Sequence, residues 1–398
     1  MDKINLHDYI QGEISKNKNE FFEISDFIFE HPELGDEEFK SSNYLANLLE
    51  ENGFTVEKPY LNLETAFRAE FKNGDGPTIA FLAEYDALPG YGPNKLPAHA
   101  CGHNWIAATT VGAGILLSKQ KDLFKGTIVI FGTPAEETTG RKIDMTDSGA
   151  FDDVDAAFQM HLHENSNLKA RALAMGALEF EFLGKATHAA VNPEDGVNAL
   201  DAVMLTFTAI NYLRQQLKSD VRIHGIVTEG GQAANTIPDH CKCLFYVRAA
   251  KKNYFEKVFE KVKNCAHGAA LMTGAELKIN YPENIYYDLI LNPVLLKLME
   301  KHMELSGFEP LSDVEEIPGS TDIGNVSYAC PTLYGNVGIA NGEAIVHEEK
   351  FIQYANSSEA KKRILTTVES FVCSAIELSQ NPEMVKEVKN SFLKQTSK

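Results

Sequence analysis

Three short apolar runs in the first half of the chain constrain the fold more than any other feature. They are TIAFLA (78–83), GTIVIFG (126–132) and AAFQM (156–160), and a segment with helical apolar spacing, 105–119, lies between the first two. Short apolar runs that end in polar loops are typical of buried strands. The rhythm of strand, helix and strand therefore predicts an α/β unit built on a mainly parallel sheet.

The pattern changes at about residue 175. ALEFEFLG alternates as a half-exposed strand does, and it precedes a long amphipathic helical segment, two more strand-like segments, a second helix and the strand-like ELKINY. This β-α-β-β-α-β order is that of a ferredoxin-like domain. We therefore predict an inserted ferredoxin-like α+β domain at 175–286, within an α/β catalytic domain formed by 1–174 and 287–398.

Length, charge and cysteine content limit the class of protein. A chain of 398 residues is long enough for two domains. A net charge of −19 argues against a nucleic-acid partner, and no apolar run approaches the roughly 18 residues that a membrane span needs. The polar N-terminal segment gives no sign of a secretory signal, and six scattered cysteines suggest reduced thiols. We expect a cytoplasmic protein with no membrane partner.

Polar side chains with metal-binding donors follow the predicted strands or lie in the loops beside them. They are Glu84, Asp86, Cys101, His103, Glu136, Glu137, His161, His163 and, far along the chain, His347. In open α/β sheets, ligands bind beyond the carboxyl ends of the strands. Thiol, imidazole and carboxylate groups at one sheet edge are the ligand types of a borderline-soft metal.

Each group alone has an ordinary explanation. A Cys-x-His pair at 101–103 arises by chance in many chains, and His347 alone would be taken for a surface histidine. Glu136 and Glu137 could lie in a solvated loop, but adjacent carboxylates after a buried strand repel each other unless a cation lies beside them. The shared position of these groups at predicted strand ends favours the metal site.

Several motifs occur along nearly the whole chain in a recognisable order: DALPG, HACGHN, TPAEE, GKATHAA, GGQAANTIPD and GSTDIGNVS. This ordered set resembles the M20 metallopeptidase/amidohydrolase family, and HACGH is similar to its amidohydrolase branch, subfamily D. Asn104, together with GSTDIGNVS, looks most like the group of p-aminobenzoyl-glutamate hydrolase (B component) and aminoacylase-1-like protein 2.

The resemblance implies a site with two divalent ions. The implied metal ligands are Cys101, His103, Glu137, His161 and His347. Glu136 resembles the general base, and Asp86 corresponds to an aspartate that orients the site from behind the ligands. His163, two residues after His161, stays open as an alternative ligand. Two ions roughly 3.5–4 Å apart can polarise a scissile carbonyl and generate hydroxide near neutral pH. The donor types suit Zn²⁺ or Mn²⁺ and also accept Ni²⁺ or Co²⁺.

The resemblance also implies roles for residues of the inserted domain. In the family, the histidine and asparagine that match His188 and Asn235 help hold a developing oxyanion, and the histidine commonly reaches in from a partner subunit. Arg248 matches an arginine that binds a substrate carboxylate, and Ser320 and Thr321 would lie near the substrate. Without the resemblance, His188 would be an ordinary residue at a helix start, Asn235 a turn former and Arg248 a surface charge. The resemblance predicts a homodimer through the inserted domain, with a tetramer as a further option.

The leading functional hypothesis is a metal-dependent amidohydrolase. It would cleave the amide bond of a small N-acyl amino acid, an aminobenzoyl-glutamate-like compound or a dipeptide with a metal-activated water. Two alternatives remain open at this point. One is a hydrolase with Cys101 as its nucleophile, and the other is a catalytically silent M20-like binding or scaffold protein.

Overall fold

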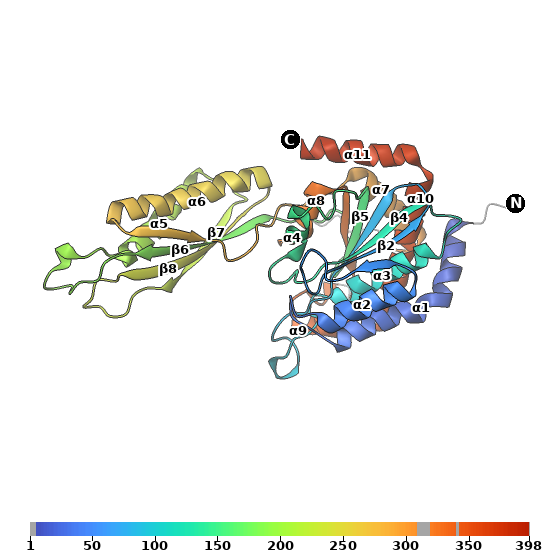
Figure 1. The fold of residues 1–398 in the computed structure, drawn as a ribbon, viewed down its shortest axis with the longest axis horizontal. Coiled ribbons are helices and arrows are strands. Elements are labelled where there is room, and N and C mark those ends of the chain that lie inside the picture. Colours follow the sequence, from blue (N-terminus) through green and yellow to red (C-terminus); the bar gives the residue numbers. More distant parts are fainter. Residues whose placement is uncertain (1–4, 309–318, 340–341, 398) are drawn as a thin grey trace. The chain divides into compact units, whose positions relative to one another are not determined.

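The computed structural model describes residues 5–308, 319–339 and 342–397 and divides into two compact units (Figure 1). Unit 1 comprises Met1–Arg171, Leu289–Ile317 and Asn325–Lys398. Unit 2 comprises Ala172–Asp288 and Pro318–Gly324. Among the described residues, each helix is too short or too polar to cross a membrane.

Unit 1 is built on a six-stranded sheet with the order β1-β2-β4-β3-β5-β10. The strands are β1 (Thr55–Glu57), β2 (Phe67–Asn73), β3 (Thr78–Ala83), β4 (Gly126–Gly132), β5 (Ala156–His163) and β10 (Thr332–Gly338). Strands β4, β3, β5 and β10 are parallel, whereas β1 and β2 form an antiparallel edge. The mixed α/β class that the sequence predicted is confirmed. The carboxyl ends of the parallel strands lie at one edge of this sheet.

The predicted strand boundaries agree with the structure for β3 and β4 but not for β5. This strand continues through His161 and His163, which the apolar pattern alone places in the following loop. The segment is longer than its apolar run because β10 pairs with β5 in parallel along nearly its whole length, from Ala157 to His163. The candidate ligands His161 and His163 therefore have the fixed orientation of strand residues.

Helices cover the sheet of unit 1. All residues of α3 (His103–Ser118) are buried, and α1 (Leu6–Glu30) and α10 (Ser358–Gln380) pack against it. Gly114 allows α3 to approach the sheet, because a Cβ at this position would lie 2.2 Å from Ile130 Cδ1. The other helices outside residues 172–288 are α2 (Phe39–Glu51), α4 (Arg141–Asp147), α7 (Pro293–Leu305), α8 (Ile323–Ala329), α9 (Glu349–Ala355) and α11 (Pro382–Thr396).

Unit 2 has an antiparallel sheet with the order β7-β8-β6-β9. Its elements are, in chain order, β6 (Ala174–Leu183), α5 (Ala199–Leu213), β7 (Arg222–Glu229), β8 (His240–Ala249), α6 (Lys252–Thr273) and β9 (Glu276–Asn280). Helices α5 and α6 pack against each other and against the sheet (Figure 1). Cys241 and Cys243, two residues apart on β8, are both buried in the apolar core of this unit.

Candidate metal centre

The loop that carries the first candidate ligands turns sharply into α3. Gly102 precedes this helix with a left-handed φ of +82°, a conformation that other residues adopt only at a cost. A Cβ at Gly102 would also lie 3.1 Å from Leu162 Cβ. The glycine thus permits the close turn that brings Cys101 and His103 to the carboxyl end of β5.

The thiol of Cys101 lies between two imidazoles. Its Sγ is 3.4 Å from His161 Nε2 and 3.3 Å from His347 Nε2. His347 has a left-handed φ of +65°, and its backbone N–H donates a 2.9 Å hydrogen bond to Ala100 O. This bond ties the late histidine to the loop of the thiol, so three donors from distant parts of the chain meet.

One buried carboxylate, Asp86, positions the remaining ligands. Its Oδ1 lies 2.9 Å from His103 Nδ1, and its Oδ2 accepts a 2.9 Å hydrogen bond from the backbone N–H of Glu137. The other ring nitrogen of His103, Nε2, lies 3.8 Å from Glu137 Oε1. His347 Nε2 is 3.2 Å from the same oxygen. Asp86 therefore holds both an imidazole and a carboxylate in place around a shared point.

Several buried polar atoms at this point form no hydrogen bond within the described part of the chain. They are His103 Nε2, Glu137 Oε1 and Glu84 Oε2. A buried polar atom without a partner costs about 1–3 kcal/mol. The donor atoms also form three overlapping groups in which all atoms lie within 4.8 Å of one another: Cys101–His103–His161, Cys101–Glu137–His347 and His103–Glu136–Glu137. Buried ligand atoms that lack a hydrogen-bond partner and lie this close together are suited to bind divalent metal ions.

The electrostatics of the site point the same way. Burial, reinforced by the charge of Glu137, raises the pKa of the Cys101 thiol well above its usual range. Burial opposes the charged form of His103, but Asp86 and Cys101 outweigh it and raise the pKa of this imidazole well above its usual range. Burial and the nearby His103 lower the pKa of His161 to about 4, so its ring is neutral near pH 7. The raised pKa of His103 reflects the negative charge of Asp86 beside it, and such buried negative charge favours a cation.

The pair of glutamates lies in a tight turn after β4. Ala135 has a left-handed φ of +57°, and its N–H donates a 2.8 Å hydrogen bond to Glu38 Oε1. Burial, and then the charge of Asp86, raise the pKa of Glu38 to about 8, so this carboxyl is mostly neutral at pH 7. Both Glu136 and Glu137 are partly buried at this turn, and both belong to the donor group with His103.

The sequence did not reveal a buried ion pair that lies against the ligands. Glu84 Oε1 accepts hydrogen bonds from Lys142 Nζ at 2.6 Å and Gln159 Nε2 at 2.7 Å, and both charged side chains are almost fully buried. Burial opposes ionisation of Glu84, but Lys142 and His103 lower its pKa to about 2. Its Oε2 lies 3.5 Å from His103 Nε2. A carboxylate directly after an apolar strand indicates that a buried counter-charge exists, but nothing in the pattern identifies Lys142.

Two neighbouring histidines belong to none of the three donor groups formed by the described residues. His163 is two residues after His161 on β5, and its Nδ1 lies 3.3 Å from Glu164 Oε2. His99 Nε2 instead forms a 2.9 Å hydrogen bond with the carbonyl of Ile28, which braces the loop. Of the two alternatives on β5, the structure brings His161 to the thiol.

Two of the predicted substrate-side residues are neighbours within unit 2. His188 forms an isolated β-bridge with Thr236, and the N–H of Ala189 donates a 3.0 Å hydrogen bond to Asn235 O. Both His188 and Asn235 are exposed. Their side chains are therefore available on one pair of adjacent loops.

The other predicted substrate-side residues also belong to unit 2. Arg248 is the penultimate residue of β8 rather than its last, and its guanidinium carbon lies 5.4 Å from the ring centre of Tyr246. Ser320 and Thr321 precede α8, and Thr321 O accepts a 3.1 Å hydrogen bond from the N–H of Gly324. This places Ser320 and Thr321 in a short turn.

A parallel-sheet edge that gathers thiol, imidazole and carboxylate donors is typical of a metal-binding protein with an α/β fold. Residues 80–369 match the Peptidase family M20/M25/M40, and the chain belongs to this family. The resemblance seen in the sequence motifs is thereby confirmed, and the protein is a hydrolase.

Individual relatives cover most of the chain. It is 33% identical over 385 residues to the Xaa-Arg dipeptidase of Mus musculus, in a match that covers 93% of this chain and 88% of the relative. It is 34% identical over 291 residues to p-aminobenzoyl-glutamate hydrolase (B component) of Escherichia coli (strain K12). This match covers 69% of this chain and 60% of the relative. The fold matches the crystal structure of a dinuclear metal-binding M20 peptidase from Bacillus subtilis. The TM-score is 0.67 at 21% identity, over 92% of this chain and 99% of that chain.

Proposed function

We propose that the protein is a two-metal amidohydrolase that cleaves the amide bond of a small N-acyl amino acid, an aminobenzoyl-glutamate-like compound or a dipeptide. The observation that carries this proposal is the thiol of Cys101 within 3.4 Å of imidazole nitrogens from His161 and His347. The unsatisfied atoms of His103 and Glu137 beside it add the other donors. Metal-dependent amide hydrolysis is supported at the level of the family.

The proposed ligands are Cys101, His103, Glu137, His161 and His347. Cys101 Sγ lies beside Nε2 of both His161 and His347, so we assign it to both ions as a shared ligand. The peptidase from Bacillus subtilis with a similar fold binds a dinuclear metal centre, which supports two ions per chain in this proposal. Zn²⁺ or Mn²⁺ suits these donors, and Ni²⁺ or Co²⁺ is also compatible. When bound, the ions supply Lewis acidity towards the scissile carbonyl and towards water.

The residues around the ions orient ligands and move protons. Glu136 takes a proton from the attacking water and delivers it to the leaving amine. Asp86 accepts the Nδ1–H of His103, which leaves the Nε2 lone pair free for a metal. Lys142 keeps Glu84 ionised beside His103 and so fixes the negative charge of the site.

Unit 2 supplies the substrate-side groups in this proposal. We assign His188 and Asn235 to the oxyanion, Arg248 to a substrate carboxylate, and Ser320 and Thr321 to further substrate contacts. The proximity of the His188 and Asn235 loops supports the first assignment. The two relatives act, by their names, on an Xaa-Arg dipeptide and on p-aminobenzoyl-glutamate, which supports a substrate that ends in a carboxylate.

We propose that residues 175–286 form a ferredoxin-like dimerisation domain and that the enzyme is a homodimer, with a tetramer as a further option. The β-α-β-β-α-β order supports the fold of this domain. Large apolar side chains are exposed on α5 and on the edge strand β7, among them Met204, Tyr212 and Ile226. Such exposure on an unpaired edge is typical of an interface. We also propose a cytoplasmic location, which the six free thiols support.

The proposal is tested with a panel of dipeptides, N-acyl amino acids and p-aminobenzoyl-glutamate, assayed with each of the four metals. We expect hydrolysis that chelation abolishes and metal restores, and we expect Cys101→Ser to lower the metal content. Activity that resists chelators but is lost on thiol alkylation would make Cys101 the nucleophile. Full metal content with no turnover on the whole panel would indicate a scaffold or binding protein.

A further inference from the structure

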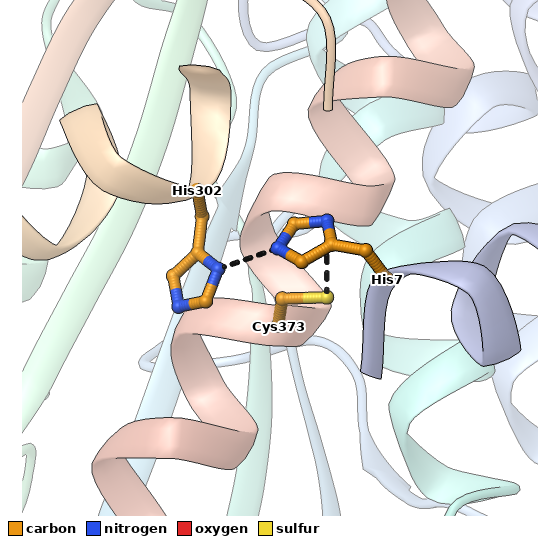
Figure 2. Close-up of side chains that lie close together, drawn as sticks. All are labelled: His7, His302 and Cys373. Atoms are coloured by element: carbon orange, nitrogen blue, oxygen red, sulfur yellow. Dashed lines mark hydrogen bonds between the residues drawn. The ribbon is translucent and has the colours of Figure 1, made fainter. Parts of the chain in front are cut away.

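A second group of thiol and imidazole side chains meets among the helices of unit 1 (Figure 2). His7 lies on α1, His302 on α7 and Cys373 on α10, and we call these residues the helix cluster. All are buried, with exposed fractions of 7%, 2% and 0%. One donor atom from each lies within 4.8 Å of the others. None of the three belongs to the proposed catalytic site.

Helix α10 supplies a carboxylate to each imidazole of the cluster. Glu369, Cys373 and Glu377 recur every four residues and therefore share one face of the helix. His7 Nδ1 lies 2.6 Å from Glu369 Oε1, and His302 Nε2 lies 2.9 Å from Glu377 Oε2. A carboxylate at the outer nitrogen is the usual arrangement behind a metal-binding histidine, because it orients the ring and makes it a better donor.

The inner nitrogens of the two rings face each other. His7 Nε2 and His302 Nδ1 are 2.9 Å apart. If each ring donates its outer N–H to its carboxylate, two neutral rings direct their lone pairs at one another, which is repulsive without a cation. A shared proton would satisfy the rings alone. The buried Cys373 Sγ lies 4.0 Å from the outer nitrogen of His7, Nδ1, and within 4.8 Å of a ring nitrogen of each histidine. It adds a third donor that a metal ion would use and a shared proton would not.

We propose that the helix cluster binds one Zn²⁺ ion through His7 Nε2, His302 Nδ1 and Cys373 Sγ. The side chain of Asn5 caps α1 by accepting the N–H of His7, so the ion would join the first turn of α1 to α7 and α10. Two imidazoles and a thiolate are donors that zinc prefers. We assign this ion a structural role because all three ligands are buried among the helices. With three protein ligands, a water would take the fourth position of a tetrahedral zinc.

The geometry and charge of the cluster suit this ion after a small adjustment. Zn–N bonds of roughly 2.0–2.1 Å at tetrahedral angles place two nitrogens about 3.3 Å apart, so the rings would separate by about 0.4 Å. On binding, Cys373 releases its proton to solvent and a zinc–thiolate unit with one positive charge remains. This unit and Lys301, which pairs with Glu377, balance the charges of Glu369 and Glu377.

The test counts metal in full-length protein that carries Cys101→Ser, which removes the thiol of the catalytic centre. This protein is stripped with a chelator, reloaded with Zn²⁺, freed of unbound ion and analysed for zinc per chain. We expect Cys373→Ser, and separately His302→Gln, to remove one further zinc per chain. Cys330→Ser is the matched control, because Cys330 is a buried thiol of the same unit, and it should change nothing.

A spectroscopic measurement needs no change in the helix cluster itself. Co²⁺ added to the stripped Cys101→Ser protein should give a thiolate-to-cobalt charge-transfer band and the intense visible bands of a tetrahedral site. An equal zinc content in the Cys373, His302 and Cys330 variants, or the lack of a charge-transfer band, would overturn the proposal and leave the rings with a shared proton. Failure of the catalytic proposal would appear separately, as an unchanged metal content on Cys101→Ser alone.

Discussion

Two clusters in unit 1 have the same kinds of donor, a thiol and several imidazoles with carboxylates behind or beside them. In the sheet-edge cluster, Cys101 lies between His161 and His347, and the side chain of His347 is 47% exposed. In the helix cluster, His7, His302 and Cys373 are all buried. The same chemistry is therefore placed once at an accessible edge and once inside the helical layer.

The difference between the clusters lies in the backbone that carries them. The sheet-edge cluster depends on loops with left-handed residues, at Gly102, Ala135 and His347, whereas the helix cluster uses regular helical positions. Loops at a strand edge leave ligands accessible to substrate, whereas the packed helices bury the ligands of the helix cluster. One arrangement suits catalysis and the other suits a structural ion.

The largest effect that separates the clusters should come from the proposed general base. Glu136→Gln should lower kcat by about 10²–10⁴-fold while the metal content stays unchanged, because only the proton transfer is lost. The exposed Glu64→Gln is the control and should leave kcat unchanged. Metal analysis and steady-state kinetics on the same preparations test whether kcat falls while the metal content stays the same. A Glu136→Gln enzyme with nearly normal turnover would show that the base lies elsewhere.

The sheet-edge cluster also depends on a buried charge pair that can be broken. Lys142→Met leaves Glu84 buried without its counter-ion and should lower the free energy of unfolding by about 3–5 kcal/mol. Denaturant unfolding of metal-free protein measures the loss. The double variant with Glu84→Met should recover much of the loss, because two apolar side chains can replace a buried pair. A loss below about 1 kcal/mol in the single variant would contradict this role of Lys142.

The turn beneath Glu136 should make stability depend on pH. Glu38 has a folded-state pKa of about 8, raised from 4.5 by burial first and by Asp86 second, so the folded protein holds a proton that the unfolded chain releases. Its stabilising effect is complete below pH 4.5 and is lost as the pH rises through 8. The loss over this whole pH range should be on the order of 5 kcal/mol. Glu38→Gln, which mimics the neutral carboxyl, should flatten this slope, and an unchanged slope would show that another group titrates.

The smallest effect concerns the orientation of the ligands. Asp86→Asn should weaken metal binding or activity by about 10–100-fold, because the amide cannot accept both from His103 and from the N–H of Glu137 as the carboxylate does. Metal titrations followed by activity measurements at saturating metal separate the two contributions. Equal metal affinity in the variant and the wild type would mean that Asp86 does not orient the ligands.

Local patterns in the sequence were sufficient to predict much of unit 1. The apolar runs of β3 and β4 coincide with the strands, and the ordered motifs led to the family. They also placed thiol, imidazole and carboxylate groups near one edge of the sheet. Hydrophobic periodicity is a property of neighbouring residues, so such features can be read without knowing which distant segments meet.

Only the tertiary structure decided the remaining contacts. His161 and His163 share one face of β5, and pairing with β10 fixes how far along the strand each lies, which places His161 beside the thiol. Lys142 reaches Glu84 only because α4 brings it to the end of β3, and the helix cluster joins residues from the two ends of the chain. Side chains this far apart in sequence meet through packing, which no local pattern encodes.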